Sequence, residues 1–278
     1  MIMQDIPTDA FTGRLALEKV EENLFRGTCH PGAPLRAFGG QVAAQSLIAA
    51  GATVAPDRVV HSLHGYFIRP GRTDRPIVYQ VDRTRDGGSF TTRRVVAVQD
   101  GETIFSLSAS FQRPEASPEH QADMPTVAGP EIPPAAWETQ DGDGVLSIFG
   151  SALEVRCVGD PGRGLPSTGQ GPRQQMWVRV RDPLPDSALL HACALTYISD
   201  VRLAVTADLP HRSEPAVPLV ASLDHAVWFH RPFRADAWLL FDMESPNYAS
   251  SRGLTRGQFF TRTGELVASV VQEVLIRR

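Results

Sequence analysis

The chain has 278 residues, of which 42% are hydrophobic and 21% are charged, and its formal net charge is −4. This length allows one large domain or two of ordinary size, and the slightly acidic balance argues against a nucleic-acid partner. No apolar run approaches the roughly 18 residues that a membrane-spanning helix needs. The first ten residues carry no signal-like pattern, so we expect a protein without a membrane or secretory segment.

The first half of the sequence predicts a strand, a helix and then four further strands. The stretch 15–25 is expected to be a strand, and 42–50 an Ala-rich helix that is buried on most of its surface and ends at Gly51. Turn signals such as Asp86-Gly87-Gly88 and Asp100-Gly101 then separate successive strands. Those strands are expected at 61–68, 77–85, 89–98 and 103–112. This order indicates an α+β fold in which an antiparallel sheet wraps around a helix.

The second half of the sequence restarts the same pattern after a proline-rich stretch. Residues 114–145 contain this stretch and are predicted to be a linker, and 160–172 a flexible loop. Asp186-Ser187 is expected to cap a helix at 188–197. Strands are expected at 153–158, 175–180, 219–229, 237–244, 251–262 and 266–276. We therefore divide the chain into an N-terminal repeat (1–113), the linker and a C-terminal repeat (146–278).

The two halves also match each other in individual residues. Arg231-Pro232 follows Arg69-Pro70 by 162 residues, and Gly264-Glu265 follows Gly101-Glu102 by 163. A repeat of this length corresponds to a whole small domain rather than to a solenoid unit. Differences between the halves then indicate which of them keeps a chemical site.

Gln272 is the clearest of these differences. In the last strand, alternation places it on one face with Val270 and Val274. Its counterpart in the first half is Ala109, an ordinary core residue. Burying an amide without partners costs about 1–3 kcal/mol by mutational estimates. We therefore expect specific partners for Gln272, either as a structural amide or as part of a site.

Two further polar positions interrupt apolar elements of the second half. Ser222 and Asp224 are predicted to share one face of the strand 219–229. Asp200 follows the apolar helix at the negative end of its dipole, where an acid is mildly unfavourable. The matching point of the first helix, Ala50-Gly51, carries no acid. Each signal is weak alone, and a surface acid or an inert serine would explain it equally.

Other chemistries lack their patterns in this sequence. Motifs of the GxSxG, HExxH, Walker A and EF-hand types are missing, and three widely spaced cysteines form no CxxC pair. His61 and His64, like His225 and His230, have odd spacings, so the members of each pair point to opposite faces of a strand. We expect no metal, no cofactor and no disulfide, which fits a cytoplasmic protein.

Several blocks of this sequence resemble one enzyme family. The blocks 17–27, 38–42 (FGGQV), 60–71 and 85–90 resemble the N-terminal half of the type II acyl-CoA thioesterases, the TesB-like proteins. The blocks 223–232 (LDHAVWFHRP) and 267–273 (VASVVQE) resemble the C-terminal half. The resemblance spans nearly the whole chain except for the linker and the loop 160–172. It implies a double hotdog, in which two repeats each combine a long helix with an antiparallel sheet.

The same resemblance implies a catalytic site in the C-terminal repeat. The family holds and polarises a water with an Asp, a Thr or Ser, and a Gln, which fall here on Asp200, Ser222 and Gln272. Asp200 would act as general base or water orienter, while the other two fix the water and assist the oxyanion. Serine keeps the hydroxyl but lacks the stiffness of threonine, so an altered rate is expected rather than lost activity.

The resemblance further implies an acyl-CoA substrate and a homo-oligomer, either a dimer or a tetramer. Backbone N–H groups at 189–192 are candidate oxyanion donors, because a helix N-terminus favours negative charge. Candidate substrate contacts are Leu189, Leu190, Arg252 and Arg256, although the two arginines also fit exposed strand charges. Two other functions remain open. One is a non-catalytic acyl-CoA sensor, and the other is a hotdog enoyl-CoA hydratase, whose Asp and His spacing we do not find.

Overall fold

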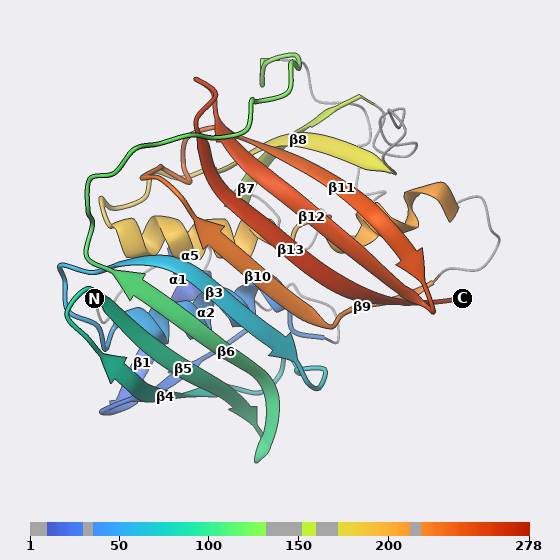
Figure 1. Ribbon diagram of the computed structural model, residues 1–278. Helices are drawn as coiled ribbons and strands as arrows, with labels where there is room; N and C mark the ends of the chain where they lie inside the picture. The colour runs from blue at the N-terminus through green and yellow to red at the C-terminus, as the bar shows by residue number, and fades with distance from the viewer. Residues whose placement is uncertain (1–9, 30–35, 132–151, 160–171, 212–217) are drawn as a thin grey trace. The chain divides into compact units, whose positions relative to one another are not determined.

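A computed structural model describes residues 10–29, 36–131, 152–159, 172–211 and 218–278 (Figure 1). The chain forms two compact units. The first comprises Met1–Glu119 and Asp182–Ile198, and the second comprises His120–Arg181 and Ser199–Arg278. The units therefore do not follow chain order, because the segment 182–198 groups with the N-terminal part.

The first unit contains an antiparallel sheet with the strand order β1-β2-β4-β5-β6-β3 (Figure 1). Its helix α2, Gly39–Gly51, packs against this sheet. Its other helices are α1 (Phe11–Leu15) and most of α5 (Ala188–Ser199). The strands are β1 (Leu17–Glu21), β2 (Leu24–Gly27), β3 (Val59–Phe67), β4 (Ile77–Asp86), β5 (Phe90–Gln99) and β6 (Glu102–Gln112).

Helix α2 is buried over most of its surface, including its polar residues. Gln41 and Gln45 are each 1% exposed, and both side-chain amides donate to the carbonyls of Arg14 and Thr28. Burial of these amides is tolerated because their donors are satisfied. The sequence-based expectation of a helix buried on most of its surface therefore extends to its polar residues.

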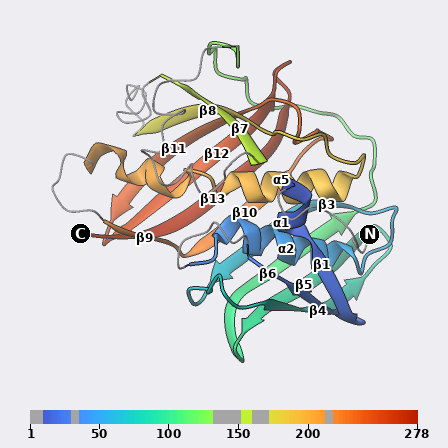
Figure 2. The same ribbon diagram turned by 180° about the vertical axis from the view of Figure 1, so that it is seen from behind.

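Helices α2 and α5 lie against each other within the first unit (Figure 2). A side chain at Gly40 would collide with the carbonyl oxygen of Tyr197, and one at Gly51 would collide with Leu189. The start of α2 thus meets the end of α5, so the helices run antiparallel. Glycine is needed at Gly40 because the backbone of α2 closely approaches a backbone carbonyl there, whereas at Gly51 the close neighbour is the Leu189 side chain.

The predicted strand at 15–25 is wrong in one respect. The structure has a hairpin there, with β1 pairing antiparallel to β2. Asn23 turns the chain with φ of 62°. Asparagine tolerates this left-handed conformation better than most residues. The apolar positions were read as one run because they continue across the turn.

The second unit contains an antiparallel sheet with the order β10-β13-β12-β11-β8-β7, and β9 also pairs with β13 (Figure 1). The 3-10 helix η2, Ala204–His211, packs on this sheet through Ala207 against Val274 and Ile276. The strands are β7 (Leu153–Val158), β8 (Arg173–Val180), β9 (Leu219–Ser222), β10 (Asp224–Phe229), β11 (Leu239–Ala249), β12 (Arg252–Thr261) and β13 (Leu266–Arg277).

The strand orders of the two units correspond to each other. The series β1-β2-β4-β5-β6-β3 matches β7-β8-β11-β12-β13-β10, taken along the chain. Both units thus build their sheet with the same antiparallel connections, as the sequence repeat predicts. This correspondence allows the last strands, β6 and β13, to be compared position by position.

The described part of the predicted linker, 114–131, forms no helix or strand, as its prolines predict. From His120 on, it nevertheless belongs to the second unit and packs within it. The indole of Trp177 donates to the Ala128 carbonyl at 2.8 Å, and Met124 and Val127 pack against a cluster around Trp177 and Leu240. The rest of the linker, the loop 160–171 and the boundary at 146 lie outside the described residues. The domain division at 113 and 146 stays a prediction.

One stretch, Ala188–His211, is long and apolar enough by composition to cross a bilayer, among the residues that the structure describes. It is not a single α-helix, since α5 ends at Ser199 and η2 begins at Ala204. Its most apolar window is 78% buried within the fold. Core helices of soluble proteins show the same features, so this stretch is weak support for a membrane span.

Candidate active site

The three polar residues singled out in the second half meet within the second unit. Gln272 lies in β13 and is fully buried. Its Nε2 donates to Asp200 Oδ1 at 2.9 Å and to Ser222 Oγ at 2.5 Å. One amide group therefore joins a carboxylate and a hydroxyl that are separated by 22 positions in the sequence.

The chemistry of these groups fixes the direction of the hydrogen bonds. A carboxylate only accepts, so the amide must turn its NH₂ towards Asp200. Because both N–H groups of Gln272 are then used, its role is to set the spacing between Asp200 and Ser222. Ser222 accepts from Gln272 and keeps its own proton for a third group. Together Asp200 and Ser222 offer one acceptor and one donor to a water molecule.

A β-bulge turns Ser222 towards Gln272. Both β9 and β10 pair with β13, with Ser222 opposite Val274 and Ala226 opposite Val271. Three residues thus lie between Ser222 and Ala226, whereas only two lie between Val271 and Val274 in β13. One extra residue on one strand of a pair defines a β-bulge. The predicted continuous strand at 219–229 is therefore wrong, because one extra residue breaks it at Leu223.

The bulge also corrects the prediction that Ser222 and Asp224 share a face. The register of β10 places Asp224 on the face of Glu273, opposite to that of Ser222. Asp224 Oδ1 accepts the Glu273 N–H at 2.6 Å, and the Leu223 N–H donates to the Glu273 carbonyl. Burial raises the pKa of the Asp224 carboxyl, the backbone N–H of Glu273 lowers it, and the charge of Glu273 raises it again. Asp224 therefore fixes the bulge rather than facing the site.

The two arginines predicted to contact substrate form surface ion pairs. Arg252 pairs with Glu273 at 2.9 Å, and Arg256 pairs with Glu244. Both guanidinium side chains are about half exposed. Exposed pairs of this kind contribute little to stability. A role for these arginines towards the CoA phosphates stays a prediction.

The predicted contacts Leu189 and Leu190 lie in the first unit and are partly buried. Ser187 caps the helix, as expected, because its Oγ accepts the Leu190 N–H and its carbonyl accepts the His191 N–H. Two of the N–H groups proposed as oxyanion donors are thus already used. The roles of Leu189 and Leu190 towards substrate stay predictions.

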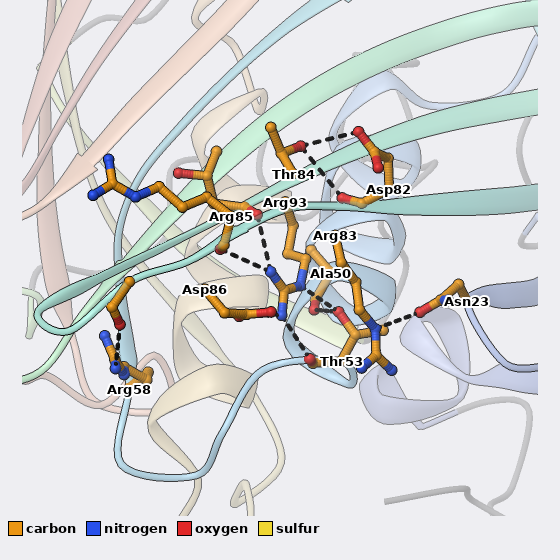
Figure 3. Close-up of polar contacts among 12 residues, drawn as sticks. Asn23, Ala50, Thr53, Arg58, Asp82, Arg83, Thr84, Arg85, Asp86 and Arg93 are labelled. Carbon is orange, nitrogen blue, oxygen red and sulfur yellow. Dashed lines mark hydrogen bonds and ion pairs between the residues drawn. The ribbon is translucent and has the colours of Figure 1, made fainter.

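Opposite the counterpart of Gln272, the first unit carries a buried arginine. Ala109 in β6 lies opposite Arg93 in β5, whereas Gln272 in β13 lies opposite Thr255 in β12. Arg93 is 1% exposed and donates to the hydroxyl and carbonyl of Thr53, beyond the end of α2 (Figure 3).

An ion pair completes the partners of this buried guanidinium. Arg93 Nη2 lies 2.7 Å from Asp86 Oδ1, and Arg93 Nη1 donates to the carbonyls of Arg85 and Thr92 (Figure 3). Sequence reasoning missed Arg93. The signal that could have revealed Arg93 is the same as for Gln272, because each is a polar residue on an otherwise apolar face of a strand.

Comparisons with known proteins agree with this fold. The family model described as acyl-CoA thioesterase matches residues 159–275, and the acyl-CoA thioesterase N-terminal domain matches 28–112. Acyl-coenzyme A thioesterase 8 of Rattus norvegicus is 40% identical over 98% of this chain and 90% of its own length. Acyl-CoA thioesterase 2 of Haemophilus influenzae is 36% identical, with 95% of each chain covered.

Solved structures give the same result. The acyl-CoA thioesterase II TesB2 of Mycobacterium marinum is 48% identical, covers 96% of each chain and superposes with a TM-score of 0.82. A hot dog fold protein of Alicyclobacillus acidocaldarius, at 20% identity and a TM-score of 0.75, supports the fold alone. The fold and the paired repeats thus define a double-hotdog thioester hydrolase. The chain belongs to the acyl-CoA thioesterase family.

Two sequence-based expectations are confirmed by these matches, namely the α+β double hotdog and the acyl-CoA thioesterase class. The sensor and hydratase alternatives lose their support at the level of the family. The roles of Asp200, Ser222 and Gln272 in catalysis stay predictions.

Proposed function

We propose that this chain hydrolyses acyl-CoA by direct attack of a water molecule that Asp200 and Ser222 hold. The observation that carries the proposal is the pair of hydrogen bonds from the Gln272 amide, which joins these two groups at 2.9 and 2.5 Å. A water placed between them accepts from the Ser222 hydroxyl and donates to the Asp200 carboxylate. This arrangement directs a water lone pair away from both groups, where a thioester carbonyl carbon can be attacked.

The reaction then moves one proton: a base takes it from the attacking water, and the leaving thiolate receives it at the end. As the water oxygen bonds to the carbonyl carbon, Asp200 takes a water proton, and the carbonyl oxygen becomes an oxyanion. When the oxyanion re-forms the carbonyl, the C–S bond breaks and the thiolate of CoA takes the proton from Asp200. The products are the free acid and CoA, and Asp200 returns to its carboxylate form.

A covalent route through Ser222 has less support. A serine nucleophile needs a base that takes its proton. Ser222 Oγ instead lies against an amide N–H of Gln272, which donates and cannot accept a proton. The water route therefore uses the groups in the protonation states that their contacts favour.

The relatives' names support acyl-CoA as the substrate, since the Rattus norvegicus and Haemophilus influenzae proteins are named acyl-CoA thioesterases. The acyl chain that this protein prefers is to be measured with a panel of acyl-CoAs. A homo-oligomer, a cytoplasmic location, and the absence of nucleic-acid and membrane partners complete the proposal as predictions.

The test is the release of free thiol from acyl-CoAs of different chain lengths by the purified protein. Asp200→Asn keeps the size of the side chain but removes the base, so kcat should fall by at least about tenfold. Asp82→Asn changes an exposed carboxylate of β4 in the same way and should leave kcat unchanged.

Three results would contradict this proposal. One is wild-type turnover in Asp200→Asn with the fold intact. Another is a burst of CoA release before the steady state, which would indicate an acyl-enzyme on Ser222. The third is tight acyl-CoA binding without any thiol release, which would favour the sensor.

A further inference from the structure

His225 is a buried histidine that the proposed mechanism does not use. It lies in β10 and is fully buried, and its Nε2 is 2.7 Å from Ser199 Oγ. Burial lowers the pKa of the imidazole to about 4, so the ring is neutral at physiological pH. Its Nδ1 is also buried, and no hydrogen-bond partner for it occurs among the residues that the structure describes.

The partner of His225 is placed next to the proposed base. Ser199 directly precedes Asp200 in the chain and is itself fully buried. A contact that fixes Ser199 therefore limits where the Asp200 carboxylate can lie. The separation between Asp200 Oδ1 and Gln272 Nε2, 2.9 Å, depends on this placement.

The bulge explains how one short segment reaches both sides of the site. In a regular strand, Ser222 and His225 would point to opposite faces, because their spacing is odd. The extra residue at the bulge turns both towards the same face, where Ser222 meets Gln272 and His225 meets Ser199. Asp224, between them, holds the bulge against β13. Segment 222–225 thus sets the position of the hydroxyl and of the base together.

We propose that His225 is a positioning residue, which holds Ser199 so that Asp200 stays within hydrogen-bonding distance of Gln272. This inference rests on the proposed role of Asp200. We assign His225 no catalytic role of its own, because one ring nitrogen contacts Ser199 and the other is buried. A buried nitrogen without a partner lowers stability, so an apolar residue would serve a purely structural purpose better.

The test uses a matched pair of amides at position 225. The side-chain amide of glutamine reaches about as far as Nε2, whereas that of asparagine reaches only as far as Nδ1. His225→Gln can therefore keep the contact with Ser199, and His225→Asn cannot. We expect His225→Asn to lower kcat about tenfold, the size of a disturbed general base, with KM changed less than about twofold. His225→Gln should retain most of kcat.

Ser199→Ala removes the same contact from the other side and should give the same loss of kcat. The double variant of Ser199→Ala with His225→Asn should be no worse than the worse single variant, because both remove one interaction. His61→Asn is the matched control, since His61 Nε2 contacts Ser110 Oγ at 2.8 Å in the first unit. It removes a His–Ser contact outside the proposed site and should leave kcat unchanged.

Wild-type kcat in Ser199→Ala would overturn the inference, and so would equal losses in His225→Gln and His225→Asn. The inference would also be overturned if kcat fell and KM rose in proportion to the drop in melting temperature across these variants. That pattern indicates a structural role. If His225→Asn does not fold, Ser199→Ala and His225→Gln still decide. The failure of the proposed function is distinguishable, because it appears as wild-type turnover in Asp200→Asn whatever the variants at 225 do.

Discussion

Replacing Gln272 by methionine should separate activity from stability. Methionine has nearly the length and volume of glutamine, so the buried space in β13 stays filled. The change removes the two hydrogen bonds to Asp200 and Ser222. It also removes Gln272 Oε1, a buried acceptor for which the described part of the chain offers no partner.

The loss of the two hydrogen bonds and the removal of the unpaired acceptor affect stability in opposite directions. A hydrogen bond to a charged group contributes about 1.5–3 kcal/mol, and a neutral one about 0.5–1.5 kcal/mol. If half of this energy serves to hold Asp200 and Ser222 at the correct spacing, kcat falls roughly 5- to 40-fold, at about 1.4 kcal/mol per factor of ten. Stability loses the same bonds but gains about 1–3 kcal/mol from the removed unpaired acceptor. With mid-range values, a loss of about 3 kcal/mol and a gain of about 2 kcal/mol leave the free energy of unfolding lower by only about 1 kcal/mol.

Two measurements check this prediction on the same preparations. Free-thiol release gives kcat and KM for an acyl-CoA, and urea titration gives the free energy of unfolding. The expected result is a large loss of kcat while the free energy of unfolding falls by only about 1 kcal/mol. A variant that keeps wild-type kcat would refute the role of Gln272 as the spacer of the site. A loss of stability that matches the loss of activity would refute the separation of the two effects.

Two further predictions concern the first unit and the response to pH. Ala109→Gln should leave kcat unchanged and cost about 1–3 kcal/mol of stability by overpacking, because Ala109 is buried opposite Arg93; any gain of activity in kinetic assays would contradict this. Burial holds the pKa of folded His225 at about 4, below its ordinary 6.5, so the unfolded chain takes up the proton first. The stability that the neutral imidazole provides is complete above pH 6.5 and should be lost as pH falls towards 4. Urea titrations at several pH values should therefore show that the free energy of unfolding depends less steeply on pH in His225→Gln than in the wild type. Identical slopes in wild type and variant would contradict it.

The sequence located the polar positions of the site but not their contacts. Gln272 was found because an amide interrupts the apolar alternation of a strand, a pattern that depends only on local spacing. Its hydrogen bond to Asp200 connects two residues that are 72 positions apart in the sequence. Such a contact depends on how β13 and the chain after α5 are placed, which spacing along the chain does not encode.

Regular elements were predictable where the local pattern was uninterrupted. The strand expected at 153–158 coincides with β7, and the helix expected at 188–197 begins at the same residue as α5. The hairpin of β1 and β2 was missed because its apolar positions continue across the turn at Asn23. The linker was recognised by its prolines, whereas its packing near Trp177 was not.

The sequence by itself determined the repeat, the fold class and the inequality of the two halves, since each follows from residue types at fixed spacings. Only the tertiary structure decided how the site is assembled. The bulge at Leu223 exists because β9 and β10 pair with the same strand in two registers. That one-residue shift turns Ser222 and His225 to the same face, and no periodicity within 219–229 specifies it. The pairing of strands thus determines which polar residues of this chain can act together.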